Sequence, residues 1–328
     1  KLVLSAFAFQ AVGALAGTIA GYVILSLRPE IGAWRWMYAT AIVPAALVML
    51  ARLTISDSVH WLMSQGRKRD AEAELARLLK REPPYPKSVS LKDGGPAHGD
   101  AERPNGRWRD LLAGRARRAT ILASVPWFLQ DLGTYGIGIF TPTILARTIG
   151  GHAHTPARNM SDLVAAELFA ARGAALLDML LIAGIVAAVL LADRIGRIRL
   201  QVIGFIGCAI GLGLAALSLH TDGTLRTSLL FAGFVLFNFM TNVGPNAQTY
   251  LLAGEVFPTA LRGKGAGAAA SFAKIGAVLT AFLFPVLLAD AGIDFLMTTL
   301  VVTSLLGAWV TWLFRIETTG INLETLEH

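Results

Sequence analysis

The segment LQVIGFIGCAIGLGLAALSL, residues Leu200–Leu219, contains no charged side chain. A helix needs about 20 predominantly apolar residues to cross the roughly 30 Å hydrocarbon core of a bilayer, and this segment has that length. Within lipid, every backbone N–H and C=O group needs an internal hydrogen-bond partner, so a single spanning segment must be helical. Leu200–Leu219 therefore predicts a transmembrane helix.

Seven further segments of the 328-residue chain have the same length and apolar character. They are Leu2–Leu25, Trp34–Leu53, Thr120–Arg147, Gly173–Ala192, Ser228–Leu252, Gly265–Ala289 and Ile293–Phe314. The composition agrees, because 54% of the residues are hydrophobic and 16% are charged, whereas soluble domains carry about 25% charged residues. A soluble protein would have to bury eight such helices in one core. The sequence thus predicts an all-α integral membrane protein.

The basic residues are distributed unevenly between the two predicted sides of the membrane. If the long polar segment Thr54–Ala119 is cytoplasmic, 22 of the 29 Lys and Arg residues lie on that side. Cytoplasmic loops of membrane proteins carry such an excess. We therefore expect a multi-pass protein of the plasma (inner) membrane with both termini of this chain in the cytoplasm. The net charge of +7 is explained by topology, and a nucleic-acid partner, which would need stacking aromatics as well, is not expected.

Two loops interrupt the spans. In the long segment, Gly66–Arg81 predicts a short amphipathic helix, and the Pro/Gly-rich sequence after it predicts a flexible linker. The second loop, Thr148–Arg172, contains His152 and His154, which would bind a metal only with further ligands. The single cysteine, Cys208, provides neither a disulfide nor a cysteine zinc site. We expect no cofactor and no metal.

Polar residues occur where lipid would not tolerate them unpaired. In WFLQDLGTYGIGIF (Trp127–Phe140), Trp127, Asp131 and Tyr135 follow i, i+4, i+8 spacing, which keeps them within about 80° of one helix face. A charge at membrane depth costs at least about 2.5 kcal/mol unless it is paired or faces a watery cavity. Lys274 is a second charge within a span. The two charges indicate a functional cavity or, alternatively, a buried ion pair with no role in binding.

Three motifs carry a resemblance to a known family. They are WRWMYATAIVPA followed by GRKRDAEAEL, DRIGRIRL (Asp193–Leu200), and GPNAQTYLLAGEVFPTALRGKGAG (Gly244–Gly267) with its E-x-F-P-T-x-x-R signature. Together they resemble the sugar-porter-like branch of the major facilitator superfamily over essentially the whole chain. The resemblance implies helices five to twelve of a twelve-helix fold, with the N-terminal four helices missing.

The same resemblance implies a division of the chain. Residues 1–53 would hold the last two helices of the N-terminal half, and residues 54–119 the cytoplasmic linker with its short amphipathic helix. Residues 120–314 would form the six-helix C-terminal half, and residues 315–328 a cytoplasmic tail. The chain departs from the family at ISDSVHWL (Ile55–Leu62), where P-E-S-P-R-W-L is usual, because Asp57 replaces the Glu and His60 replaces the Arg.

Within that superfamily, WFLQDLGTYG is similar to the seventh-helix motif of phosphate:proton symporters. That branch also has an Asn in a G-P-N motif, a Lys in the eleventh helix and a Gln in the fifth. The resemblance implies that the substrate-binding residues are Gln10, Trp127, Asp131, Tyr135, Asn246 and Lys274. The structural alternatives are packing for the aromatic residues and a helix kink for Asn246. A sugar porter would instead show paired glutamines, whereas here Gln130 is followed by Asp131.

These residue types suit an anion that moves with a proton. Trp, Tyr, Gln and Asn carry donors for phosphate oxygens, and Lys274 supplies a compensating charge. Asp131 becomes a donor when it is protonated, so a proton there would help to hold phosphate and its loss would help to expel it. We expect a proton-coupled secondary transporter, most simply an inorganic phosphate:H+ symporter that works by alternating access. It is not expected to be an enzyme, because no nucleophile–base or metal constellation occurs in the sequence.

Other readings of the function stay open. The chain would alternatively carry a sugar or an organic acid on the same fold. It would otherwise be a truncated remnant that does not transport, since a cavity between two repeats needs both of its walls.

Two further features of the sequence suggest mechanical roles. Gly13, Gly17 and Gly21 form a ridge that would let a neighbouring helix approach closely. Charged residues with signs suited to a cytoplasmic ion-pair gate are Asp193, Arg194, Arg197, Glu255 and Arg262. The alternative for each is ordinary anchoring at the positively charged inner surface.

Overall fold

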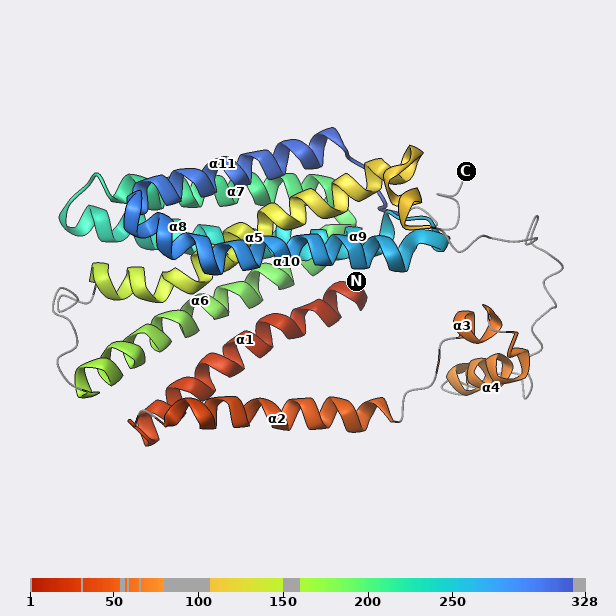
Figure 1. Ribbon diagram of the computed structural model, residues 1–328, viewed down its shortest axis with the longest axis horizontal. Helices are drawn as coiled ribbons and strands as arrows, with labels where there is room; N and C mark the ends of the chain where they lie inside the picture. Colours follow the sequence, from red (N-terminus) through yellow and green to blue (C-terminus); the bar gives the residue numbers. More distant parts are fainter. Residues whose placement is uncertain are drawn as a thin grey trace. The chain divides into compact units, whose positions relative to one another are not determined.

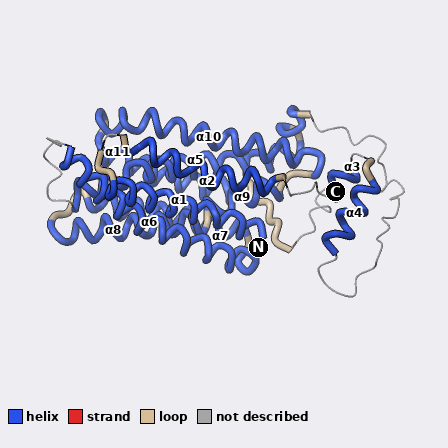
Figure 2. Tube along the Cα trace, turned by 90° about the horizontal axis from the view of Figure 1, so that it is seen from below, coloured by secondary structure: helices blue, strands red, loops and turns tan. Residues whose placement is uncertain are grey.

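The computed structural model describes residues 2–30, 32–53, 57, 59–64, 66–79, 107–149 and 160–320. All regular secondary structure in these ranges is helical (Figure 2). In chain order (Figure 1), the elements are α1 (Leu2–Leu27), α2 (Ala33–Arg52), α3 (Val59–Ser64), α4 (Lys68–Leu79), the 3-10 helix η1 (Trp108–Leu112), α5 (Gly114–Ile149), α6 (Met160–Ile195), α7 (Arg197–Ser218), α8 (Gly223–Val243), α9 (Pro245–Glu255), α10 (Thr259–Asp290) and α11 (Gly292–Leu313).

Within the described ranges, six helical stretches are long and apolar enough to cross a membrane. They are Leu4–Leu27, Ala33–Arg52, Arg197–Ser218, Gly223–Glu255, Leu261–Asp290 and Gly292–Leu313. Each overlaps one of the eight predicted spans. The other two predicted spans lie in α5 and α6, which are helices of 36 residues each. Gln130 and Asp131 lie within α5 and reduce its apolar character.

The predicted loop at Thr148–Arg172 is too long. Helix α6 begins at Met160, so the second half of that loop is helical. Its sequence MSDLVAAELFAAR is rich in Ala and Leu, which favour a helix, and Asp162 lies in the first turn, where a negative charge is favourable. Helical propensity here extends the helix beyond the apolar segment. His152 and His154 lie outside the described residues.

The chain divides into two compact units. One comprises Lys1–Ala33 with Pro104–His328, and the other comprises Trp34–Arg103. In the second unit, α4 lies within the segment for which an amphipathic helix was predicted. Its residue Ala71 is fully buried, and Asp70 in its first turn pairs with Arg67 at 2.8 Å. The Pro/Gly-rich segment after α4 lies outside the described residues.

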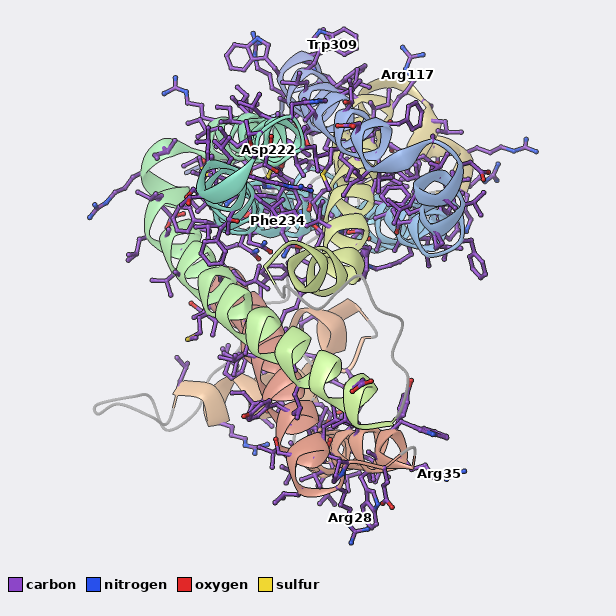
Figure 3. All side chains as sticks on the ribbon, turned by 90° about the vertical axis from the view of Figure 1, so that its left-hand side faces the viewer. Arg28, Arg35, Arg117, Asp222, Phe234 and Trp309 are labelled. Carbon is purple, nitrogen blue, oxygen red and sulfur yellow. The ribbon has the colours of Figure 1, made fainter. Side chains whose placement is uncertain are left out.

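The core of the first unit is formed by α5 and α7–α11. One apolar cluster joins Ile137 of α5 and Phe234 of α8 to Leu300 of α11. Phe234 lies inside the bundle, whereas Trp309 projects from its surface, as expected for a helix that faces lipid (Figure 3). A second cluster, around Leu122 and Phe257, joins α5 to the ends of α9 and α10.

Helices α7 and α8 pack with their backbones nearly in contact. A Cβ atom added to Gly204 would lie 2.5 Å from Cα of Gly244, and one added to Gly233 would lie 2.5 Å from the carbonyl oxygen of Gly211. Small residues at helix interfaces permit this approach, which is a common mode of packing within membranes. The two glycine pairs therefore fix how closely α7 approaches α8 and the Gly-Pro step that follows it.

Helix α1 packs against α6 through an apolar cluster. Leu4 of α1 is buried with Ala188 and Ala192 of α6 and Leu251 of α9. No described residue lies against the ridge of Gly13, Gly17 and Gly21, because a Cβ atom at any of the three would meet no described atom within 4 Å. The close approach of a neighbouring helix to this ridge stays a prediction, and the contact between α1 and α6 uses bulkier side chains.

Candidate functional site

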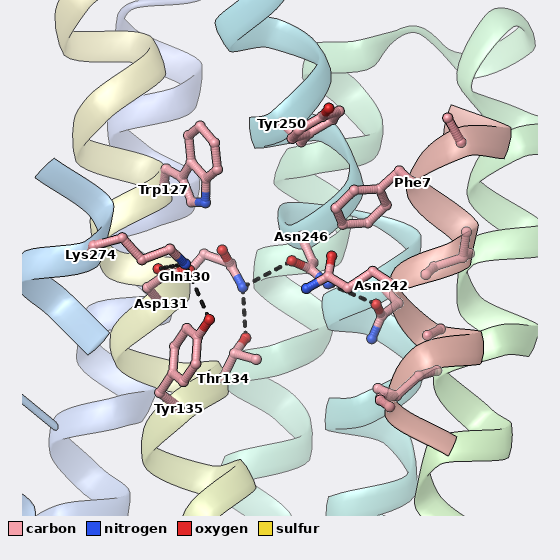
Figure 4. A pocket seen from close by; sticks show the side chains of 16 residues that line it. Phe7, Trp127, Gln130, Asp131, Thr134, Tyr135, Asn242, Asn246, Tyr250 and Lys274 are labelled. Atoms are coloured by element: carbon pink, nitrogen blue, oxygen red, sulfur yellow. Dashed lines mark hydrogen bonds and ion pairs between the residues drawn. The ribbon is translucent and has the colours of Figure 1, made fainter. Parts of the chain in front are cut away.

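A cavity of about 540 Å³ lies within the first unit, among α1, α5, α6, α8, α9 and α10 (Figure 4). All six predicted substrate-binding residues line this cavity: Gln10, Trp127, Asp131, Tyr135, Asn246 and Lys274. They are far apart in the sequence, and the packing of the helices brings them together. Polar and aromatic residues that were not predicted also line it, namely Phe7, Gln130, Thr134, Asn242 and Tyr250.

The charged group of the cavity joins α5 to α10. The Lys274 ammonium donates hydrogen bonds to Oδ2 of Asp131 at 2.9 Å and to the hydroxyl of Tyr135 at 3.1 Å. The Asp131 side chain is 3% exposed, whereas that of Lys274 is 55% exposed. The carboxylate is thus buried behind an ammonium that faces open space. An ammonium has three N–H donors, so this geometry leaves one beyond the two that are used.

A glycine contact sets the separation of α5 and α10 beside this pair. A Cβ atom added to Gly276 would lie 2.7 Å from the carbonyl oxygen of Phe128. Gly276 is two residues after Lys274, and Phe128 is three residues before Asp131. The absence of a side chain at Gly276 therefore lets the two helices approach closely enough for Lys274 to reach Asp131.

A chain of amide side chains forms the opposite part of the cavity. Asn246 donates to Oδ1 of Asn242 at 2.9 Å. Gln130 donates through Nε2 to Oγ1 of Thr134 at 2.7 Å and to Oδ1 of Asn246 at 3.3 Å. In Figure 4, Gln130 lies between the Asp131–Lys274–Tyr135 group and the two asparagines.

A break between α8 and α9 places the two asparagines. Helix α8 ends at Val243, and Pro245, which has no N–H to donate, begins α9. Asn242 is thus the penultimate residue of α8, and Asn246 lies in the first turn of α9. The chain was predicted to cross this point as one span, and the Gly-Pro step divides that span into two helices.

Aromatic side chains line another part of the cavity. The rings of Trp127 and Tyr250 meet edge to face with centroids 6.3 Å apart. Tyr250 also contacts Phe7 of α1, at 5.1 Å between centroids. Gln10 lies one helical turn after Phe7 on α1, and its side chain is exposed. Among the described residues, Gln10 has no hydrogen-bond partner that would compete with a ligand.

Helix periodicity would have found most of the residues that sequence reasoning missed. Thr134 lies four residues after Gln130, on the face next to the Trp127–Asp131–Tyr135 series. Asn242 and Tyr250 lie four residues before and after Asn246. Residues four apart share a helix face. Phe7 gives no comparable signal, because its ring is one of many apolar side chains on α1.

Three of the five predicted gate residues meet at one end of the bundle. Arg197 pairs with Asp193 at 2.9 Å and with Glu255 at 3.4 Å, and the Arg197 side chain is 10% exposed. Arg194 is exposed, and Arg262 donates to the carbonyl oxygen of Phe257 at 3.4 Å. We refer to Asp193, Arg197 and Glu255 as the end cluster.

The segment after α11 completes the end cluster, and this role of the segment was not predicted from the sequence. The Glu317 carboxylate accepts hydrogen bonds from the backbone N–H groups of Arg197 at 3.1 Å and Ile198 at 3.4 Å. It therefore caps the N-terminus of α7, where unpaired N–H groups favour an anion. Thr318 donates to Glu255, and Oγ1 of Thr319 accepts from Arg197.

At the motif that departs from the family, Asp57 pairs with Arg67 at 3.9 Å, and nothing is described for the side chain of His60.

Comparison with known proteins identifies relatives of this chain. The inner membrane metabolite transport protein YgcS of Escherichia coli (strain K12) is 29% identical over 312 residues, which cover 95% of this chain and 62% of that protein. The repressible high-affinity phosphate permease of Neurospora crassa is 28% identical over 265 residues, which cover 75% of this chain and 43% of that protein. The chain thus spans less than two thirds of the length of these relatives.

The fold matches solved transporters. The proton:xylose symporter XylE, solved with bound 6-bromo-6-deoxy-D-glucose, is similar with a TM-score of 0.71 at 23% identity, covering 100% of this chain and 66% of that one. These family and structural neighbours are multi-pass membrane transporters and not enzymes. The profile of the sugar (and other) transporter family matches residues 1–328. The chain therefore belongs to this family.

Proposed function

We propose that the protein is a proton-coupled secondary transporter whose substrate is inorganic phosphate. The observation that carries this proposal is the ammonium of Lys274, which faces a cavity while it is bound to the buried Asp131. A positive charge that water does not fully screen favours the binding of an anion, and Lys274 has that position. Trp127, Tyr135, Asn246 and Gln10 would provide donors to the remaining phosphate oxygens.

The Asp131–Lys274 pair also suggests how proton and phosphate are coupled. With Asp131 ionised, the two charges cancel, and two N–H groups of Lys274 are engaged. Protonation of Asp131 would release the ammonium for an anion. Because one proton and one monovalent phosphate enter together, the cavity would never hold an uncompensated charge, which is costly at membrane depth. Loss of the proton would restore the pair and expel the anion.

We propose the corresponding topology for the whole protein. The eight predicted spans would be helices five to twelve of a twelve-helix transporter, with residues 54–119 as the cytoplasmic linker and residues 315–328 as the cytoplasmic tail. The end cluster would then lie at the inner surface and close that side of the cavity. The missing wall would be provided by four N-terminal helices that these residues do not include.

A second candidate substrate is a sugar or an organic acid. The amide groups of Gln130, Asn242 and Asn246 favour it, because amides hydrogen-bond hydroxyl groups as readily as phosphate oxygens. The similarity to a xylose symporter supports the same alternative. Phosphate and a sugar differ in their need for Lys274, since a neutral sugar gains nothing from a cation, whereas an organic acid is itself an anion and would use Lys274 as phosphate does.

Uptake into proteoliposomes tests the substrate. The complete gene product that contains these 328 residues would be reconstituted and given labelled phosphate, D-xylose or a dicarboxylate under an inward proton gradient. We expect gradient-dependent uptake of phosphate that excess D-xylose does not reduce. Uptake of D-xylose or the dicarboxylate, with no uptake of phosphate, would contradict the proposal and favour the second candidate.

A further inference from the structure

The amide chain of the cavity has a fixed direction. Nδ2 of Asn242 donates to the backbone carbonyl oxygen of Asn238 at 3.0 Å, and a carbonyl oxygen only accepts. Asn242 must therefore present Oδ1 to Asn246, so Asn246 donates to Asn242 and presents its own Oδ1 to Gln130. Gln130 must then donate to Asn246. The backbone acceptor at one end thus orients each amide as far as Gln130.

The free end of this chain is an acceptor. The two N–H groups of the Gln130 amide are directed to Thr134 and Asn246, which leaves Oε1. Gln130 is 4% exposed, and its Oε1 is a buried atom with no hydrogen-bond partner among the described residues. A buried acceptor without a donor is unfavourable. Because Gln130 lines the cavity, a bound ligand can provide that donor.

From this geometry we infer that Gln130 accepts a hydrogen bond from a hydroxyl of protonated phosphate and so selects phosphate over sulfate. This inference rests on the proposed phosphate function and adds a specificity-determining residue to it. The cavity would recognise two features of one ligand. Lys274 would bind the negative charge, and Oε1 of Gln130 would require a proton on the anion.

The chemistry of the two anions makes this requirement selective. Phosphate and sulfate are tetrahedral and similar in size, but at neutral pH phosphate keeps at least one hydroxyl group and sulfate keeps none. Sulfate would place an oxygen against Oε1 of Gln130, with two acceptors facing each other. Specificity then follows from an unpaired buried group in the wrong complex, which discriminates more strongly than the loss of a contact alone. Arsenate and selenate form a second pair with the same difference.

Competition binding tests the inference. Labelled phosphate would be bound at pH 7 to the complete gene product in detergent, and phosphate, arsenate, sulfate and selenate would compete. We expect sulfate and selenate to bind at least about tenfold more weakly, the effect of one hydrogen bond to a charged ligand. Gln130→Met should weaken phosphate and arsenate about tenfold and leave the two proton-free anions within about threefold. The phosphate-to-sulfate ratio would thereby fall.

Two further variants separate this role from a structural one. Gln248→Met is the matched control, because Gln248 of α9 is also fully buried with an amide that lacks partners among the described residues, but it does not line the cavity. The Gln248→Met variant should keep the wild-type ratio of phosphate affinity to sulfate affinity. Thr134→Val removes one acceptor of Gln130 but leaves its hydrogen bond to Asn246, so the amide keeps its direction and Oε1 still faces the ligand. This variant should therefore also keep the ratio of phosphate affinity to sulfate affinity.

The outcomes distinguish the two proposals. If the wild-type protein binds sulfate as tightly as phosphate, or if Gln130→Met keeps the wild-type ratio, the role of Gln130 is wrong while phosphate binding stands. If the wild-type protein binds no phosphate, the proposed function itself is wrong, and so is the proposed role of Gln130.

Discussion

Asp131 and Lys274 depend on each other for stability as well as for the proposed binding. Lys274→Met would leave the Asp131 carboxylate buried without its cation. A buried charge without its partner is destabilising, and the half-exposed ammonium reduces the effect, so we expect a loss of about 1–2 kcal/mol. Thermal unfolding in detergent should show a lower Tm for Lys274→Met and recovery of part of the loss in Lys274→Met/Asp131→Asn.

The same lysine separates phosphate from a neutral sugar. Phosphate binding should fall by more than about tenfold in Lys274→Met, since a charge-assisted contact is lost. Lys264→Met, on the same helix but outside the lining of the cavity, is the control and should bind as the wild type does. Phosphate binding that survives Lys274→Met would contradict the proposal, because the proposal rests on the position of the Lys274 ammonium.

The hydroxyl of Tyr135 should have a smaller effect. It accepts a hydrogen bond from Lys274, and its removal in Tyr135→Phe keeps the ring beside the ammonium. We expect phosphate affinity to fall about fivefold, in line with the loss of roughly 1 kcal/mol for one hydrogen bond. Equilibrium binding of labelled phosphate measures this, and a fall as large as that of Lys274→Met would indicate that Tyr135 contacts the anion through more than its hydroxyl.

At the scale of single residues, the sequence predicted which charged residues line the cavity better than it predicted the uncharged residues beside them. Asp131 and Lys274 stand out because charge is rare within apolar segments. Gln130 is uncharged, and its hydrogen bond to Asn246 joins positions that are far apart in the sequence, so no local pattern specifies it. Asn242 is uncharged as well, but it lies four residues before Asn246, and helix periodicity would have found it.

At the scale of helices, the α7–α8 contact should tolerate no side chain. Gly204→Val would place atoms where Gly244 and Pro245 lie, because a Cβ atom alone would be 2.5 Å from both. Backbone cannot move aside as a flexible side chain can, so we expect the variant to unfold or to lose several degrees of Tm. Gly213→Ala, where a Cβ atom meets nothing within 4 Å, is the control. Its Tm should be unchanged or slightly higher, because Ala favours helix over Gly.

The helices themselves were largely predictable, and their ends were not. Apolar length located the segments because lipid imposes it. It did not locate the start of α6, since Met160–Arg172 is helical through its composition rather than its apolarity. The role of Glu317 at the N-terminus of α7 was missed for another reason, which is that the capping residue lies 120 positions away from its partner.

At the scale of the whole molecule, the proposed orientation can be tested by thiol labelling, because these 328 residues contain one cysteine. Cys208 is 2% exposed, so it should give little background with a thiol reagent that cannot cross membranes. Thr221→Cys, in the turn between α7 and α8, should be labelled in intact cells. Arg199→Cys, near the start of α7, should be labelled only in inverted vesicles. The reverse pattern would place the termini of this chain outside and contradict the assignment from Lys and Arg.

The central claim is that Asp131 couples a proton to phosphate movement. The most direct measurement compares two modes of transport in proteoliposomes containing the complete gene product: phosphate accumulation driven by an inward proton gradient, and phosphate exchange with equal pH on both sides. Asp131→Asn should keep exchange, because the amide resembles the protonated carboxyl, and should lose gradient-driven accumulation. Asp290→Asn, the same substitution at an exposed site at the end of α10, should keep both modes. Accumulation by Asp131→Asn at the wild-type level would contradict the account.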